Sequence, residues 1–127
     1  MLKIKNVSKS YGSFKAINDI NLTIKPGVVY GCVGHNGAGK TTLIKAIVGI
    51  HNFDTGEILI GGNSIKQEPL KCKQIMAYVP DNPDIYDSLT GISYLNFIAN
   101  IYQIPVETRN NLIEKYSVLF EIDKSLG

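Results

Sequence analysis

The sequence predicts a mixed α/β fold with an antiparallel pair of strands at its start. Apolar and polar residues alternate in "LKIKNV" and in "INDINLTI", and the residues between these two segments favour a turn. A third segment, "VVYGCVG", is apolar without alternation, which is typical of a strand covered on both faces. It leads into the glycine-rich stretch "HNGAGKTT", after which apolar residues recur at helical spacing. The order of these signals predicts two paired strands, a covered strand, a loop and a helix.

The first two strands differ in how clearly they alternate. In the first, alternation places Leu2, Ile4 and Asn6 on one side of the strand and Val7 on the other, together with two lysines. In the second, every other residue from Ile20 to Ile24 is apolar, which predicts a half-buried strand. The tripeptide "KPG" that follows predicts a turn.

A helix is predicted directly after the glycine-rich stretch. Its apolar residues are Leu43, Ile44, Ile47 and Val48. Gly49 is placed to end this helix, because glycine readily adopts the left-handed conformation that closes a helix.

The remainder of the chain predicts two more strands and then two helices. "EILIGG" and "IMAYVP" read as strands, and prolines bracket the acidic loop that follows them. Thr90 is a candidate cap for the first helix, and Pro105 opens the second. The apolar residues expected on one face of each helix are Ile92, Leu95, Ile98 and Ile101 in the first, and Leu112, Ile113, Tyr116, Leu119 and Phe120 in the second.

The stretch from residue 34 to residue 42 fits a phosphate-binding motif. The motif consists of a glycine, any four residues, a second glycine, a lysine and then a serine or threonine. Its defined positions are occupied by Gly34, Gly39, Lys40 and Thr41. Glycines let such a loop wrap closely around an anion and point backbone N–H groups at it. A tight turn with a solvated lysine is the alternative, but the strand and helix predicted on either side supply the context that the motif requires.

The candidate nucleotide-binding residues of this loop are Gly34, Asn36, Gly37, Ala38, Gly39, Lys40, Thr41 and Thr42. Lys40 is the candidate catalytic residue, because its ammonium is placed to reach the β- and γ-phosphates. The Thr41 hydroxyl is the candidate ligand for Mg²⁺, and the Thr42 hydroxyl is a further donor to the phosphates.

Composition and charge indicate which kinds of partner and which cellular location are expected for this chain. Thirteen basic and eleven acidic residues leave a formal charge of +2, which does not favour a nucleic acid as the main partner. No run approaches the roughly eighteen apolar residues of a membrane span, and the N-terminus lacks the apolar block of a signal peptide, so we expect a cytosolic location. The two cysteines, Cys32 and Cys72, are expected to be reduced.

The chain from "VSKSYGSFKAIND" through "GHNGAGKTT" to "TGEILIGG" resembles the opening of the ATP-binding subunit of ABC transporters. The resemblance implies a P-loop NTPase fold with ATP and Mg²⁺ as cofactors. It covers essentially the whole chain but only about the first half of the family's ATPase domain. Residues 1–80 would form part of the nucleotide-binding core, and residues 81–127 would form a linking loop and the start of the helical subdomain.

Two further site residues follow from the resemblance. Tyr11 occupies the place of the family's aromatic residue that stacks on adenine. Asp81 occupies the place of a glutamine that contacts Mg²⁺ and the attacking water, and an acidic residue there resembles export-type ATPases. A carboxylate is able to ligate Mg²⁺, but Asp81 is equally interpretable as a turn aspartate.

The resemblance also implies partners. Ile85 and Tyr86 lie where the family docks its transmembrane permease subunit, although both residues are equally suited to packing within their own helical subdomain. A second ATP-binding subunit would complete a sandwich around two nucleotides. The permease would hold the intact protein at the cytoplasmic face of the membrane.

Several parts of the family's hydrolytic machinery are absent from these 127 residues. There is no "LSGGQ"-like signature, no apolar strand ending in Asp-Glu, and no later switch histidine. We therefore expect this chain by itself to bind nucleotide with negligible hydrolysis. In the family, the strand before the phosphate loop is flanked by strands that come later in sequence, so we also expect self-association through an unpaired sheet edge.

Two other interpretations remain open at this stage. One is an ABC ATPase without a transport role, acting in DNA repair or translation. The other is a small P-loop kinase of metabolites, which requires a basic lid and an acceptor site. A purely structural nucleotide binder is a further option.

Overall fold

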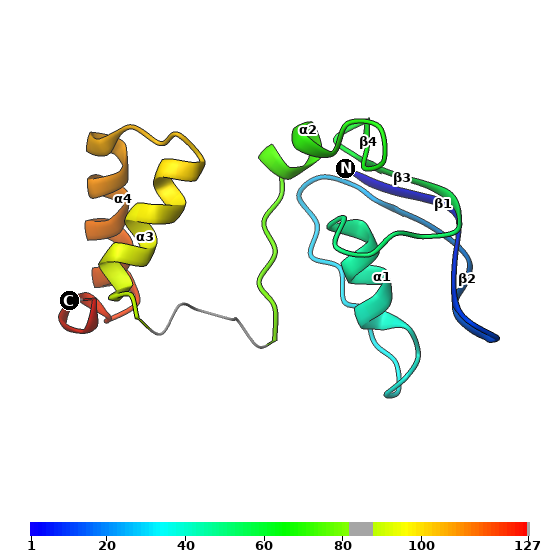
Figure 1. Cartoon of the computed structure of the whole chain (residues 1–127). Helices are drawn as coiled ribbons and strands as arrows, with labels where there is room; N and C mark the ends of the chain where they lie inside the picture. The colour runs from blue at the N-terminus through cyan, green and yellow to red at the C-terminus, as the bar shows by residue number, and fades with distance from the viewer. Residues whose placement is uncertain (82–87, 127) are drawn as a thin grey trace. The chain divides into compact units, whose positions relative to one another are not determined.

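A computed structural model describes residues 1–81 and 88–126 of the chain. The chain divides into two compact units, Met1–Val79 and Pro80–Gly127 (Figure 1).

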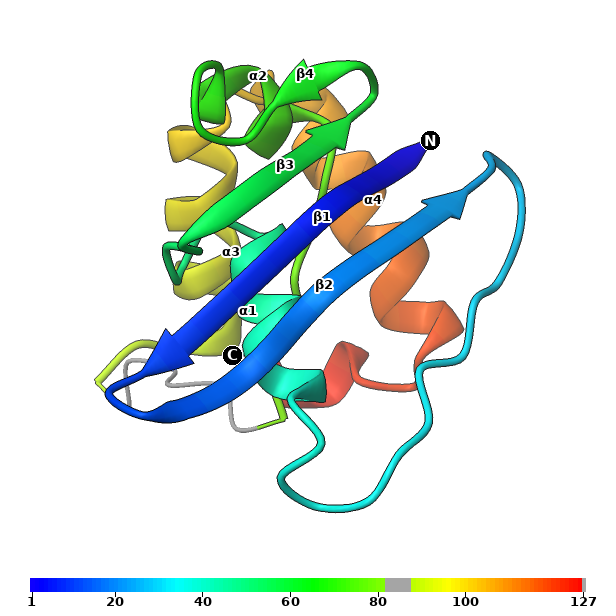
Figure 2. The same cartoon turned by 90° about the vertical axis from the view of Figure 1, so that its right-hand side faces the viewer.

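The first unit is built on a four-stranded antiparallel sheet. Its strands are β1 (Leu2–Tyr11), β2 (Phe14–Ile24), β3 (Thr55–Ile60) and β4 (Asn63–Ser64), in the spatial order β2-β1-β3-β4. Two helices, α1 (Lys40–Ile47) and α2 (Pro69–Gln74), complete the unit. Figures 1 and 2 show α1 lying against one face of the sheet.

The predicted antiparallel pair at the start of the chain is confirmed. β1 and β2 form a hairpin in which Leu2 lies opposite Ile24 and Tyr11 lies opposite Phe14. The turn is made by two residues, of which Gly12 has a φ of 58°. Alternation in β2 is also as predicted, since apolar residues from Ile20 to Ile24 are half-buried and the polar residues between them are exposed.

The alternation predicted for β1 is wrong at Val7. Ile4 and Val7 are both buried in the same core, with 2% and 0% of their surface exposed. The register of β1 against β2 shifts between these two residues, and Asn6 between them has a φ of 48°. A bulge of this kind inserts an extra residue, so Val7 turns to the side that strict alternation assigns to its neighbours.

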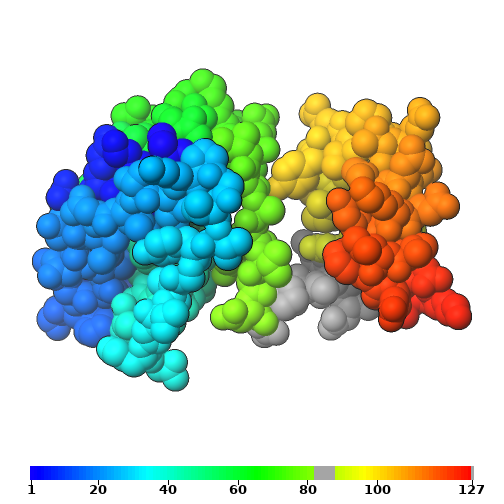
Figure 3. All heavy atoms as spheres, turned by 180° about the vertical axis from the view of Figure 1, so that it is seen from behind, coloured from blue at the N-terminus to red at the C-terminus, as the bar shows by residue number. Residues whose placement is uncertain are grey.

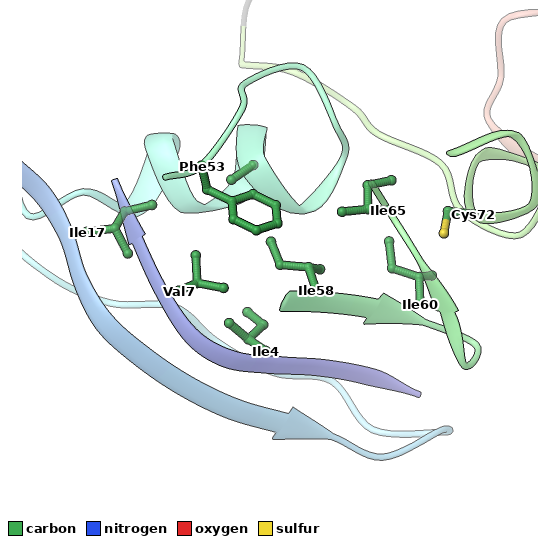
Figure 4. Packing of buried hydrophobic residues seen from close by; sticks show 9 residues of the cluster. Ile4, Val7, Ile17, Phe53, Ile58, Ile60, Ile65 and Cys72 are labelled. Carbon is green, nitrogen blue, oxygen red and sulfur yellow. The ribbon is translucent and has the colours of Figure 1, made fainter. Parts of the chain in front are cut away.

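The core of the first unit lies between the sheet and α1. Figure 4 shows Ile4, Val7 and Ile58 directed from the strands toward Phe53 and the helix. Phe53 lies in the mostly polar segment "HNFD" between α1 and β3, yet only 6% of its surface is exposed. Burial of these aliphatic and aromatic side chains fixes α1, and with it the loop before α1, against the sheet.

Two predicted strands are absent from the described residues. Residues 28–34 and 75–80 contain no strand, and neither segment pairs with the four-stranded sheet. Val29 and Val33 have exposed fractions of 104% and 96%, so this apolar run is not covered on both faces. An apolar run favours a strand only where a neighbour supplies the hydrogen-bond ladder, and no strand of the described residues pairs with either segment.

The helix predicted after the glycine loop is confirmed as α1. Gly49 follows it with a φ of 73°, and its N–H donates to the carbonyl oxygen of Ala46. This is the left-handed closure expected from the sequence.

The second unit contains helices α3 (Gly91–Ile101) and α4 (Val106–Leu119) and a short 3₁₀ helix, η1 (Asp123–Ser125). The Thr90 hydroxyl accepts a hydrogen bond from the N–H of Ser93, as predicted for a cap, and Pro105 precedes α4. The two helices and the residues after α4 line an open apolar hollow to which Leu112, Tyr116 and Phe120 contribute, but not Leu119.

Within residues 1–81 and 88–126, the helices are too short or too polar to cross a lipid bilayer. Cys32 and Cys72 are both free thiols, the first exposed and the second buried. Burial raises the pKa of the Cys72 thiol.

Candidate nucleotide-binding site

The glycine loop adopts backbone conformations that its glycines permit. Gly37 and Gly39 have φ angles of 84° and 85°, in the left-handed region that strains other residues. A Cβ on Gly39 would also overlap the carbonyl oxygen of Ala16 in β2. Gly39 therefore allows both the turn into α1 and the close approach of the loop to the sheet.

Lys40 is the first residue of α1 and its side chain returns to the loop. Its Nζ donates to the carbonyl oxygens of Gly34 at 2.6 Å and His35 at 2.8 Å. The ammonium therefore lies inside the curve of the loop, where the sequence motif places it. The described geometry puts one positive charge at the point where the loop meets the helix.

The N-terminus of α1 is open to an anion. The first N–H groups of a helix have no intrahelical partner, and Gly39 at the N-cap has no side chain to accept from them. The helix dipole adds partial positive charge at the same end. A cradle of backbone donors beside the Lys40 ammonium fits a phosphate chain in its chemistry.

A hollow of about 360 Å³ adjoins the loop. One wall is formed by β2 residues Lys15 to Asn18, and the others by Cys32, Val33, the end of the loop and α1. The β2 wall was not predicted from the sequence. The motif covers only residues 34–41, and nothing in the alternation of β2 identifies residues that face the loop.

Tyr11 ends β1 beside the β1–β2 turn. This turn and the glycine loop lie at the same end of the first unit, the lower one in Figures 1 and 2. Tyr11 is 47% exposed, and Lys9 Nζ lies over its ring, 5.3 Å from the centroid. The ring of His51 meets it edge-on, with centroids 6.5 Å apart and an interplanar angle of 85°.

Asp54 is a residue near Tyr11 that sequence reasoning missed. Its Oδ1 accepts a hydrogen bond from Lys9 Nζ at 3.0 Å, and its Oδ2 accepts one from the Ser10 N–H at 2.7 Å. Its own N–H donates to the carbonyl oxygen of Ser8 at 2.9 Å. The hydrogen bonds from Lys9 and Ser10 lower the pKa of the Asp54 carboxyl. No motif joins residues so far apart in sequence.

Of the remaining candidate residues, Thr41 and Thr42 belong to the first unit and Asp81 belongs to the second. Thr41 is exposed and Thr42 half-buried in the first turn of α1. Asp81 is exposed and belongs to the second unit, so its relation to the loop stays a prediction. Ile85 and Tyr86 lie outside the described residues.

Comparison with known protein families shows the class of protein. The family model described as "ABC transporter" matches residues 17–121, which is most of the chain. The chain therefore belongs to the ABC transporter ATP-binding family, and its fold is that of a P-loop NTPase. The family and fold class predicted from the sequence are confirmed.

Known proteins resemble this chain over much of its length. The ABC transporter ATP-binding protein YtrB of Bacillus subtilis is 34% identical over 119 residues, which cover 93% of this chain and 40% of YtrB. The uncharacterized ABC transporter ATP-binding protein YhcH of the same organism is 38% identical over 101 residues, covering 80% of this chain and 33% of YhcH.

Solved structures agree with this assignment. The ATP-binding subunit of an ABC transporter superposes with a TM-score of 0.90 at 27% identity, over 99% of this chain and 52% of that one. A dimeric bacterial ABC transporter cassette superposes with a TM-score of 0.77 at 24% identity, over 90% of this chain and 55% of that one, and it supports the fold alone. The chain thus spans about half the length of these structures, and 33% to 40% of the two Bacillus proteins.

Proposed function

We propose that this chain is the nucleotide-holding part of an ABC transporter ATP-binding subunit and that it binds ATP together with Mg²⁺. The observation that carries the proposal is the position of the Lys40 ammonium, held by the carbonyl oxygens of Gly34 and His35 at the uncapped N-terminus of α1. Family membership makes ATP the nucleotide that this geometry is expected to take.

The candidate site residues have separate roles in this proposal. Backbone N–H groups of residues 34–39 and of the first turn of α1 surround the phosphates, and Lys40 neutralises charge on the β- and γ-phosphates. Tyr11 stacks on the adenine. Mg²⁺, when bound, neutralises further phosphate charge, and Thr41 and Asp81 are its proposed protein ligands.

Transport belongs to the longer protein in this proposal. Residues 1–80 are part of the nucleotide-binding core, and residues 81–127 are the linking loop and the start of the helical subdomain. ATP hydrolysis in the intact protein drives a transmembrane permease from the cytoplasmic face of the membrane, with Ile85 and Tyr86 as contacts. A second ATP-binding subunit completes the assembly.

The test is ATP binding by the chain and by two lysine variants, measured by isothermal titration calorimetry with Mg²⁺. Lys40→Ala is expected to weaken binding by tenfold or more, because it removes a charged partner worth roughly 1.5–3 kcal/mol. Lys45→Ala is the matched control, since Lys45 has the same charge in the last turn of the same helix. Equal losses in both variants, or no ATP binding by the unmodified chain, would contradict the proposal.

A further inference from the structure

The segment that follows α1 holds the end of β1 through one carboxylate. Asp54 binds the Lys9 side chain with one oxygen and the Ser10 backbone with the other, while its N–H binds the Ser8 carbonyl oxygen. These three hydrogen bonds reach the three residues immediately before Tyr11. The Lys9 side chain is only 18% exposed, so its ammonium is held and not freely solvated.

Lys9, one of these residues, and His51 contact the Tyr11 ring. Lys9, held by Asp54, lies over the ring, and His51, three residues before Asp54, meets the ring edge-on. Cations prefer the face of an aromatic ring, and edge-to-face packing fixes the ring's tilt. Tyr11 as a whole is nevertheless 47% exposed, which is consistent with free area for a planar ligand.

These contacts link the ring to the phosphate loop. The loop leads directly into α1, and His51 and Asp54 lie in the connection between α1 and β3. At the other end of α1, the N–H groups of Ile50 and His51 donate to the carbonyl oxygen of Lys45, which ties this connection to the helix. Tyr11 is therefore positioned by a segment anchored to the helix that carries Lys40.

We infer that Asp54 is a positioning residue that sets the Tyr11 ring for a planar base, so that Asp54 contributes to recognition of the base and not of the phosphates. This inference rests on the proposed function, in which Tyr11 stacks on adenine. Asp54 does not touch the nucleotide in this arrangement. It acts through Lys9 and Ser10 on the residue that does.

The experiment compares two ligands, ATP and inorganic tripolyphosphate, which carries the phosphates without a base. Binding of each is measured by calorimetry for the unmodified chain, Tyr11→Ala, Asp54→Ala and the double variant. Tyr11→Ala is expected to weaken ATP binding about fivefold. Asp54→Ala is expected to weaken it about threefold. Tripolyphosphate binding should stay unchanged in both, and the double variant should be no weaker for ATP than Tyr11→Ala alone.

Two further variants separate positioning from stability. Asp54→Asn keeps an acceptor for the Ser10 N–H but loses the charge that holds Lys9, so its loss of ATP affinity should be smaller than that of Asp54→Ala. Glu57→Gln is the matched control, because Glu57 pairs with Lys5 at 2.8 Å in the same sheet and is comparably exposed. Glu57→Gln should leave both ligands' affinities unchanged.

The failures of the two proposals have different signatures. If Tyr11→Ala weakens ATP binding but Asp54→Ala has no effect, or weakens ATP and tripolyphosphate equally, the inference is wrong and the proposed function stands. If Tyr11→Ala leaves ATP binding unchanged, the stacking role fails, and the positioning role of Asp54 fails with it. If the unmodified chain binds neither ligand, the proposed function itself fails.

Discussion

Lys40 and Asp54 differ in how far apart in sequence their partners lie. The Lys40 ammonium contacts carbonyl oxygens five and six residues earlier in the chain. Asp54 contacts residues more than forty positions away. Of the two residues, only Lys40 belongs to a sequence motif.

The lowered pKa of Asp54 predicts how its contribution to stability varies with pH. A carboxyl whose pKa is lower in the folded state stabilises the fold above its unfolded pKa, and this contribution disappears as the pH falls through the folded pKa. The stability difference between the unmodified chain and Asp54→Asn should therefore be present at pH 7 and shrink as the pH falls below about 4. Urea unfolding at several pH values measures it. A difference that stays constant down to pH 3 or below would contradict this assignment.

Among the secondary-structure elements, the bulge in β1 decides which side chains enter the core. The register of β1 shifts on both of its sides, against β2 between Ile4 and Val7 and against β3 between Lys5 and Ser8. Gly56 of β3 lies directly against the bulge, with a φ of 90°. A Cβ at that position would overlap the carbonyl oxygens of Lys5 and Asn6. The bulge in β1 therefore requires a residue without a side chain at position 56.

Gly56→Ala and Gly62→Ala form a matched pair that tests this coupling. Gly62 has a similar φ of 94°, but nothing lies within 4 Å of a Cβ built there. Both variants should lose about 1 kcal/mol of unfolding free energy from the left-handed conformation. Gly56→Ala should lose a further 1–3 kcal/mol, roughly, because the bulge must move. Denaturant unfolding followed by circular dichroism compares them, and equal losses would argue against the close approach.

At the scale of the whole molecule, the first unit exposes an apolar segment that its own sheet does not cover. Figure 3 shows the chain around residues 28–34 on the surface of this unit. In sequence, this segment comes directly before the glycine loop. Val28, Val29 and Tyr30 have exposed fractions of 55%, 104% and 56%. Contiguous exposed apolar side chains favour association with another surface.

We therefore expect this 127-residue chain to self-associate through residues 28–34. Val29→Lys should reduce the apparent mass at a given concentration, because a charge on this segment opposes its burial. Leu70→Lys is the control, since Leu70 in α2 is also exposed, at 75%. Light scattering over a range of concentrations measures the mass. A stable monomer at high concentration, or an equal effect of both substitutions, would refute the role of this segment.

Much of the fold was predictable because its signals are local. Alternation in β2, helical spacing in α1, the glycine closure at Gly49 and the Thr90 cap all depend on residues a few positions apart. The phosphate-binding motif spans eight residues, and its glycines and lysine lie together in the structure as its spacing implies. The resemblance to ABC ATP-binding subunits, carried by the same segments, is borne out by the family match.

The sequence by itself determined the family, through its match to the family model, and it determined the loop and the helix that follows it, because these two depend on contacts between near neighbours. Tertiary structure alone decided that residues 28–34 and 75–80 contain no strand, that the bulge at Asn6 turns Val7 into the core, and that Asp54 holds the end of β1. A strand exists only where a partner completes its hydrogen bonds, and an ion pair forms only where the fold brings distant residues together. Such partners are set by packing, which no local pattern encodes.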